Sequence, residues 1–235
     1  MVVVSKGLGL LFAALILSGC AGGGMSATAM SQGLGAGWSV ATAAWSDAGA
    51  AAPPLDPRYR YLRVQRLGPS GQPAAYFALG FEDQVRGERR ETWYSALRET
   101  LQIERGRVVF SDKLHHNIQH WRQSEYLPDW PAPTQVSRYR NREDVPGLAF
   151  GAIVPRLVEA VPESVVPTAV RAAWVGDRPS GGWRWYADRV DTAAMGDAQA
   201  WRTIWLATDL QGRWRYSHQC FTPTYCLSLQ AQQPS

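Results

Sequence analysis

The feature that most constrains this chain is a series of short segments in which apolar and polar residues alternate, separated by turns rich in Gly and Pro. From residue 58 onward these segments recur every eight to twelve residues, which is typical of antiparallel strands joined by tight turns. Eleven Trp, nine Tyr and six Phe add β propensity. The sequence therefore predicts an all-β antiparallel meander that closes into a β-barrel-like domain, because closure removes exposed sheet edges.

The expected strands follow from the alternation and from the turn residues that bound each run. They are residues 58–67, 74–81, 92–96, 100–104, 107–110, 134–142, 148–154, 157–161, 183–191, 201–209, 213–219 and 226–230. Gly106 and Gly212 mark two of the turns, and Pro155 is expected to separate residues 148–154 from 157–161. Helix is expected only at residues 112–121 and 167–173.

The first nineteen residues have the pattern of a signal peptide. Lys6 precedes the apolar run 7–17, which as a helix would reach about 16 Å, roughly half of a hydrocarbon core. The run is therefore too short for a membrane span and is typical of a signal-peptide core. Residues 17–20, Leu-Ser-Gly-Cys, resemble the lipobox of bacterial lipoprotein signals. That resemblance implies cleavage before Cys20, lipidation of its sulfur and, because Ala21 is not Asp, an outer-membrane address.

Composition then divides the rest of the chain in two. Residues 20–57 comprise the lipidated cysteine and a linker rich in Gly, Ala, Ser and Thr, which is typical of a flexible tether. Residues 58–235 are expected to form a single all-β periplasmic domain. A formal net charge of +4 is too small for a nucleic-acid binder, so we expect no nucleic-acid partner.

Arginines alternate with aromatic residues in three of the expected strands. Period two places guanidinium groups on one face of a strand and the rings on the other. Two interpretations stay open: a half-buried sheet with its arginines in water, or an arginine-lined face that binds anionic saccharides. Two tryptophans on one strand face either pack in the core or form a stacking platform for sugar rings. The candidate surface for a polymer or a partner protein comprises Arg58, Arg60, Arg138, Arg140, Arg142, Arg213, Arg215, Trp183 and Trp185.

Two cysteines remain after Cys20. Cys220 and Cys226 lie six positions apart near an expected hairpin tip. Because the periplasm is oxidising, we expect them to form a disulfide. A redox role is disfavoured, since the chain has no Cys-x-x-Cys motif.

Motifs for metal binding and catalysis are absent. Histidines cluster within residues 115–120, and His116 and His120 have the spacing of zinc ligands on a helix. However, Asn117 stands where a zinc protease would have Glu, so a surface loop is expected and no metal site. No nucleophile elbow, phosphate-binding loop or dinucleotide fingerprint occurs. We therefore expect no catalytic residues and no cofactor.

Several segments resemble the YjbF/GfcB family, the lipoproteins of exopolysaccharide and group 4 capsule gene clusters. The resemblance is carried by residues 59–67, 76–80, 93–95 (Trp-Tyr-Ser), 101–110, 205–209 and 212–219. It covers most of the domain, from about residue 58 to 229, and departs from the family in the long linker and the cysteine pair. The resemblance implies a β-barrel-like fold on the periplasmic face of the outer membrane and a non-catalytic part in surface-polysaccharide production or export.

The function expected from these observations is that of an outer-membrane-anchored accessory factor. It would bind either the exopolysaccharide or capsule polymer or a protein of the export machinery. Two alternatives stay open. A periplasmic polysaccharide-modifying hydrolase would need paired acids about 5–10 Å apart, and a lipid or lipoprotein carrier would need an apolar cavity inside the barrel.

Overall fold

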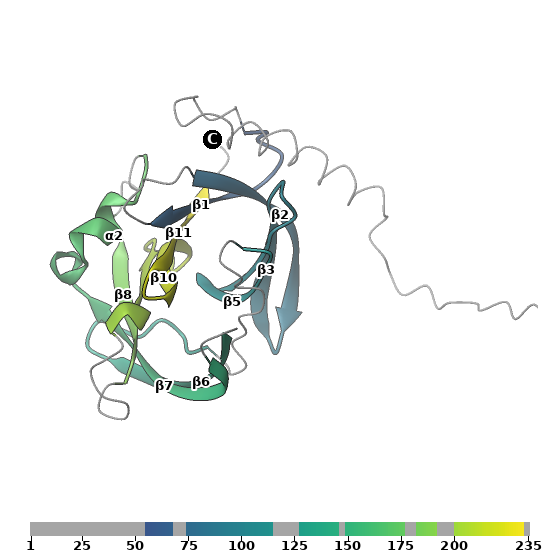
Figure 1. The fold of residues 1–235 in the computed structure, drawn as a ribbon. Helices are drawn as coiled ribbons and strands as arrows, with labels where there is room; N and C mark the ends of the chain where they lie inside the picture. Colours follow the sequence, from purple (N-terminus) through teal and green to yellow (C-terminus); the bar gives the residue numbers. More distant parts are fainter. Residues whose placement is uncertain are drawn as a thin grey trace, which may run out of the picture.

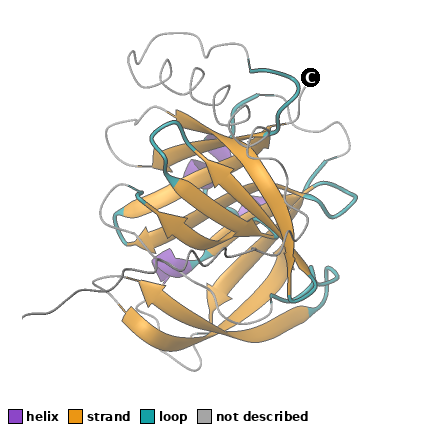
Figure 2. Ribbon diagram, turned by 90° about the vertical axis from the view of Figure 1, so that its right-hand side faces the viewer, coloured by secondary structure: helices purple, strands orange, loops and turns teal. Residues whose placement is uncertain are grey.

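The structure is a computed structural model that describes residues 55–67, 74–114, 127–145, 149–176, 182–191 and 200–232. Most of these residues belong to one antiparallel sheet that curls into a half-barrel, and they include a single short α-helix (Figures 1 and 2). The predicted all-β antiparallel fold is thus confirmed. The signal peptide, Cys20, the linker up to residue 54 and the histidine cluster 115–120 lie outside the described residues. Within the described ranges, no helix has the length and apolar character needed to cross a membrane.

The sheet has eleven strands, and the described part of the chain also contains two single turns of 3-10 helix. The strands are β1 (Tyr61–Leu67), β2 (Ala74–Val85), β3 (Glu88–Tyr94), β4 (Thr100–Glu104), β5 (Arg107–Asp112), β6 (Val136–Val145), β7 (Ala149–Val161), β8 (Arg184–Val190), β9 (Ile204–Thr208), β10 (Trp214–Thr222) and β11 (Tyr225–Gln232). The helical turns are η2 (Glu163–Val165), α2 (Thr168–Ala172) and η3 (Ala200–Arg202).

The strands form two meanders rather than one. Their order across the sheet is β5-β4-β3-β2-β1-β11-β10-β9-β8-β7-β6. The first and last strands of the domain pair along their whole length, with Tyr61 opposite Gln232 and Leu67 opposite Cys226. The pairing of β1 with β11 therefore joins the two meanders, and β5 and β6 become the two edges of the sheet.

The expected break at Pro155 is wrong, because β7 runs without interruption from Ala149 to Val161. Pro155 lies opposite Arg140 of β6, and its carbonyl oxygen accepts the N–H of Asp191 at 2.9 Å. The nitrogen and carbonyl of one strand residue point to the same side, so the missing N–H of Pro155 faces β8. The ladder with β8 ends one residue away, at the pair of Arg156 and Val190. Proline is tolerated there because its missing hydrogen bond falls at the end of the ladder and not within it.

Two hydrophobic cores hold the sheet. The larger core fills the concave inner face and includes Phe77, Trp93 and Leu206, each no more than 1% exposed. The smaller core lies on the outer face, where η2 and α2 cover β8, β9 and β10. There the Tyr216 hydroxyl donates a hydrogen bond to the Val170 carbonyl at 2.8 Å, which fixes α2 on the sheet.

Side chains join the two edges of the sheet across the interior. The carboxylate of Asp188, on β8, accepts hydrogen bonds from Arg107 Nε of β5 at 2.6 Å, Arg156 Nε of β7 at 2.9 Å and the Tyr139 hydroxyl of β6 at 2.7 Å. Burial alone would raise the pKa of Asp188, but the charges of Arg156 and Arg107 outweigh it and lower that pKa. One ionised carboxylate thus ties both edge strands to the middle of the second meander.

A second set of side-chain contacts joins β5 to β10. The buried amide of Gln219 accepts the Val108 N–H at 3.1 Å and donates to the Gly106 carbonyl at 3.3 Å. Gly106 itself approaches β9 and β10 closely, since an added Cβ would lie 2.9 Å from Leu206 and 3.2 Å from Trp214. Side chains and close backbone packing therefore join the edge strand β5 to the second meander, and we call this junction the seam of the half-barrel.

Candidate ligand-binding pocket

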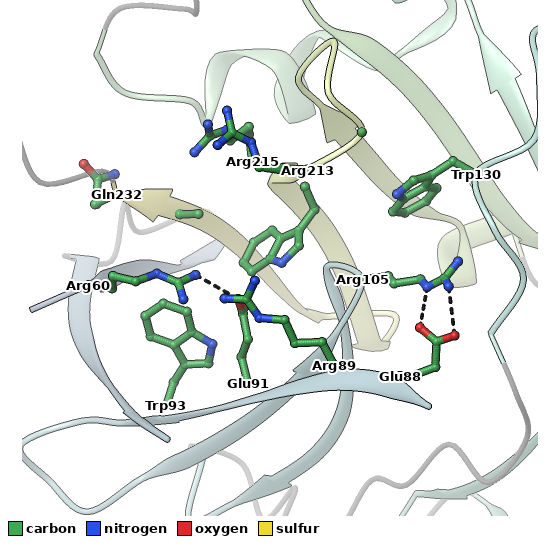
Figure 3. Close-up of a pocket in the computed structure, with 13 residues that line it drawn as sticks. Arg60, Glu88, Arg89, Glu91, Trp93, Arg105, Trp130, Arg213, Arg215 and Gln232 are labelled. Atoms are coloured by element: carbon green, nitrogen blue, oxygen red, sulfur yellow. Dashed lines mark hydrogen bonds and ion pairs between the residues drawn. The ribbon is translucent and has the colours of Figure 1, made fainter. Parts of the chain in front are cut away.

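A pocket of about 500 Å³ lies at one end of the half-barrel. It is formed where β3 and β10 begin, where β11 ends, and where the turns β4–β5 and β9–β10 meet (Figure 3). Its lining is rich in arginine and tryptophan: Arg60, Glu88, Arg89, Glu91, Trp93, Arg105, Trp130, Gly212, Arg213, Trp214, Arg215, Ala231 and Gln232. This volume lies within the range of roughly 300–1,000 Å³ that is typical of small-molecule sites.

Three tryptophans form the apolar part of the pocket wall. Trp93 is anchored in the main core, and the guanidinium of Arg60 lies 5.7 Å from its ring centroid. Trp130 and Trp214 are partly buried and pack against the same core. The buried indole N–H of Trp93 has no hydrogen-bond partner among the described residues. Because Trp93 is 1% exposed, it supports the wall from within, and the aromatic surface that a ligand can reach belongs to Trp130 and Trp214.

The first arginine pair of the pocket is held by two glutamates. Arg60 donates to Glu91 at 2.8 Å and also contacts Glu82, while Arg89 contacts Glu82 and lies 3.5 Å from Glu91. Burial alone would raise the pKa of Glu82, but Arg89 and Arg60 outweigh it and lower that pKa. Burial likewise opposes the charged form of Arg60, yet Glu91 and Glu82 raise its pKa. The two guanidinium groups are thus fixed in position as charged groups.

The turn between β4 and β5 supplies another arginine. Arg105 and Gly106 both have positive φ, of 48° and 77°, as a two-residue type I′ hairpin turn requires. Arg105 donates to both oxygens of Glu88, at 2.7 and 2.8 Å, and contacts the exposed Asp129. Such a bidentate pair fixes the plane of the guanidinium group at the rim of the pocket (Figure 3).

The turn between β9 and β10 supplies the last two arginines, which share one carboxylate. Asp209 accepts the backbone N–H groups of Gln211 and Arg213 at 3.0 Å each, which shapes the turn. It also accepts Arg213 Nε at 2.9 Å and Arg215 Nε at 3.0 Å. Burial would raise the pKa of Asp209, but its bonds to Arg213 and Arg215 outweigh it and lower that pKa. The carboxylate of Asp209 therefore fixes the orientation of both guanidinium groups.

At two of these contacts the donors face solvent and the acceptors lie beneath, whereas Glu82 and Asp129 are themselves 34% and 91% exposed. The side chains of Arg89 and Arg213 are 53% and 62% exposed, whereas those of Glu91 and Asp209 are 6% and 7% exposed. A guanidinium carries five donors, and a carboxylate partner uses only part of them. The pocket therefore suits a ligand rich in oxygen acceptors that also has a flat apolar face, as the rings of acidic sugars do.

The structure brings together part of the predicted candidate surface. Arg60, Arg213 and Arg215 line the pocket, although they come from opposite ends of the domain sequence. Arg58 is not among the lining residues and instead pairs with Asp56, with Nη2 2.6 Å from a carboxylate oxygen. Three of the nine predicted residues thus meet in the pocket.

The remaining candidates lie elsewhere. The residues Arg138, Arg140 and Arg142 are exposed on the outer face of the edge strand β6. Trp185 is 3% exposed and belongs to the smaller core with the partly buried Trp183. Of the two interpretations of these tryptophans, core packing describes where their side chains lie.

Among the lining residues that the sequence did not single out, Arg89 and Arg105 lie next to or in a turn, whereas Trp93 lies within β3. Arg89 and Arg105 follow or occupy turns with an Arg-Gly dipeptide, residues 86–87 and 105–106, whose positive φ values mark two-residue hairpins. In a meander every second turn lies at the same end of the sheet. The turns β2–β3, β4–β5 and β9–β10 therefore lie at the same end of the sheet, and the Gly residues of these turns were the available signal.

Cys220 and Cys226 form a disulfide between directly paired residues of β10 and β11. Together with His218 they are the one group in the described part of the chain whose Cys, His or acidic atoms lie close enough for a metal, within 4.8 Å. Both sulfurs are bonded to each other, so neither is a thiolate ligand here. Burial lowers the pKa of His218 to about 4, against a smaller opposing backbone hydrogen bond.

Comparisons with known proteins show a likeness to a solved structure. No family model matches this chain, and no curated protein matches it. The hypothetical lipoprotein YmcC from Escherichia coli K12 has a similar solved structure, with a TM-score of 0.45 and 13% sequence identity over 75% of this chain and 85% of that chain. A likeness of this degree establishes neither a family nor an activity for this chain, so both rest on the residues themselves.

Proposed function

We propose that this chain is a lipid-anchored protein of the bacterial envelope that binds an acidic saccharide in the arginine–tryptophan pocket. In this proposal Cys20 holds the domain on the periplasmic face of the outer membrane and residues 21–57 act as the tether. The protein takes part in exopolysaccharide or capsule production or export without catalysing a reaction. Its pocket engages the polymer, while an export protein remains the alternative partner.

One observation carries the proposal: five arginines and three tryptophans from distant segments converge on one pocket. Each arginine is oriented by a carboxylate, so the donors are held in place before a ligand arrives. Preorganised charged donors lose little conformational entropy on binding. Guanidinium groups bind carboxylates bidentately, and indole rings stack on the apolar faces of sugars.

Tethering makes a weak site sufficient for this role. For a flexible linker of this length, random-coil scaling gives a root-mean-square distance of about 30 Å between the anchor and the domain. The local concentration of a polymer or partner at the same membrane is then high, and modest affinity gives substantial occupancy. The first strand begins next to Arg60, so the tether would enter the domain beside the pocket.

Binding is tested by titration calorimetry of the mature chain, carrying Cys20→Ser, with trigalacturonate and with the neutral maltotriose. We expect binding of the acidic sugar that weakens with salt, and at least tenfold weaker binding in Arg213→Gln, since a hydrogen bond to a charged group contributes about 1.5–3 kcal/mol. Arg98→Gln is the matched control, because Arg98 is exposed and lies outside the pocket lining. Equal affinity for both sugars, or equal loss in both variants, would contradict the proposal.

The role in the cell is tested by deleting the gene and measuring surface, released and periplasmic polysaccharide separately. Loss at the surface with periplasmic accumulation, reproduced by Arg213→Gln, is the expected result. An unchanged amount with altered chain length or substitution would favour the hydrolase instead. The carrier would need an apolar cavity, whereas the described interior holds the main core and the ion pairs of Asp188.

A further inference from the structure

A row of arginines runs along the outer face of β6, away from the pocket. Arg138, Arg140 and Arg142 are exposed, while Tyr139 between them turns inward to Asp188. Among the described residues, Arg138 has a single ion pair, to Asp191 at 3.7 Å, and Arg140 and Arg142 have none. The pocket arginines differ, because each of them contacts a carboxylate at 3.0 Å or less.

Three carboxylates lie on or near this outer face, and each has a local partner. Glu159 pairs with Arg189, Asp191 lies near Arg138, and Asp144 accepts the Gly151 N–H. Glu159 and Asp191 are only 25% and 21% exposed, whereas the Arg138 side chain is 70% exposed. A partner that approaches β6 therefore meets guanidinium groups before it meets carboxylates.

Two exposed apolar residues belong to β7, the strand that pairs with β6. Phe150 is 90% exposed and Ile153, directly opposite Arg142, is 54% exposed. Gly151 has a φ of +64°, a conformation that other residues rarely adopt, and its N–H is held by Asp144 at 2.5 Å. The backbone next to Phe150 is thus fixed, so the phenyl ring is presented to solvent by a hydrogen-bonded strand end.

We propose that this β6–β7 face, made of Arg138, Arg140, Arg142, Phe150 and Ile153, docks on an anionic phospholipid surface. Guanidinium groups pair bidentately with lipid phosphates, while phenyl and aliphatic side chains enter the boundary between headgroups and acyl chains. The face belongs to the outer, convex side of the half-barrel, which suits contact with an extended surface. A saccharide site would instead use rings and donors that converge on a hollow, as they do in the pocket.

The expected affinity follows from the composition of the face. Each arginine near an anionic membrane strengthens partitioning about fivefold, so three contribute on the order of 100-fold. Partial burial of one phenyl ring adds roughly tenfold. Such binding is reversible alone and becomes substantial for a domain tethered to the same membrane. The face would then orient the domain, in addition to the proposed lipid anchor, and leave the pocket free for its ligand.

The test measures co-sedimentation of the mature chain, carrying Cys20→Ser, with vesicles of phosphatidylethanolamine and phosphatidylglycerol at 3:1. We expect binding at low salt and about 100-fold weaker partitioning in the triple variant Arg138→Gln/Arg140→Gln/Arg142→Gln. Phe150→Ser should weaken partitioning roughly tenfold without changing the net charge. All four side chains are exposed, so the far-ultraviolet circular dichroism and the melting temperature should stay unchanged.

The matched control removes three exposed arginines elsewhere and therefore the same net charge. Arg86→Gln/Arg98→Gln/Arg184→Gln should keep vesicle binding within about twofold of the parent. Equal loss in both triple variants would show a net-charge effect and overturn the proposal, as would absence of binding by the parent. If the triple variant Arg138→Gln/Arg140→Gln/Arg142→Gln lost polygalacturonate binding while its vesicle binding stayed unchanged, the face would be a saccharide site instead. Trigalacturonate binding in the pocket is measured without lipid, so the two proposals fail independently.

Discussion

Replacing Asp188 by Asn should destabilise the domain more than any exposed charge change. Asp188 is fully buried, and its carboxylate is the acceptor for Arg107, Arg156 and Tyr139. Asparagine has nearly the same size but no charge, and its NH2 group replaces one of the two oxygens that accept from Arg107 and Arg156. The variant therefore removes the counter-charge of the buried Arg107 and leaves Arg156 with Glu143, at 3.4 Å, as its remaining carboxylate.

The size of the expected loss in stability follows from the burial of Arg107 and Arg156. Arg107 and Arg156 are 0% and 2% exposed, so water cannot replace the lost carboxylate. Breaking a buried ion pair by removing one partner costs about 3–5 kcal/mol. A domain of this kind is stable by about 5–15 kcal/mol in total, so the loss is a large fraction. With a urea dependence of about 2 kcal/mol per molar, the unfolding midpoint should fall by roughly 1.5–2.5 M.

The assay is urea unfolding of the mature chain, followed by tryptophan fluorescence. Asp191→Asn is the control, because its pair with Arg138 at 3.7 Å is partly exposed and should contribute less than about 1 kcal/mol. Hydrogen exchange should also show lost protection in β5 and β6, the two edges that Asp188 holds. A loss below about 1 kcal/mol at an unchanged urea dependence would refute the view that one carboxylate closes the seam.

The lowered pKa of Asp188 determines how its contribution to stability depends on pH. The pKa of Asp188 is lowered in the folded protein, so its contribution is present above the unfolded value, near 3.8. That contribution is lost as pH falls through the lower folded value. The stability difference between wild type and Asp188→Asn should therefore be constant above about pH 5 and should shrink in more acidic solution.

Three further changes have defined outcomes. Tyr139→Phe removes one donor to Asp188 and should cost about 1.5–3 kcal/mol in the same urea assay. In the folded protein the pKa of His218 is lowered to about 4. The contribution of His218 to stability is therefore complete above its unfolded pKa of 6.5 and is lost as the pH falls toward 4. Wild type should thus lose about 2–3 kcal/mol between pH 7 and 4.5 that His218→Gln does not lose. Cys220→Ser/Cys226→Ser should cost about 2–3 kcal/mol, and a reductant should produce the same shift in wild type alone.

Local patterns predicted the strands well, because alternation and turn residues act over a few positions. The hairpins β1–β2 and β4–β5 and the short helix α2 lie where the sequence placed them. Two features depended on distant partners and were not predicted. Pro155 continues a strand because the neighbouring ladder ends beside it, and β1 pairs with β11 because the two meanders share one core.

The pocket was predicted only in part for a related reason. Period two shows on which face Arg60 and Arg213 lie, but it does not show which strand ends meet. Buried charges were a separate difficulty. Arg107, Arg156 and Asp188 look in sequence like the exposed charged residues that most chains carry, and only the fold shows that they pair inside the half-barrel.

The seam and the pocket are coupled through one side chain. Trp130 lines the pocket, and its ring centroid lies 4.8 Å from the guanidinium carbon of Arg107, which Asp188 holds from the other side. Loss of the carboxylate frees Arg107 and removes the support behind this pocket wall. Asp188→Asn protein that is still folded at 10 °C should therefore bind trigalacturonate several-fold more weakly than wild type, while Asp191→Asn should not. Unchanged affinity in a folded Asp188→Asn variant would mean that the main core alone positions Trp130.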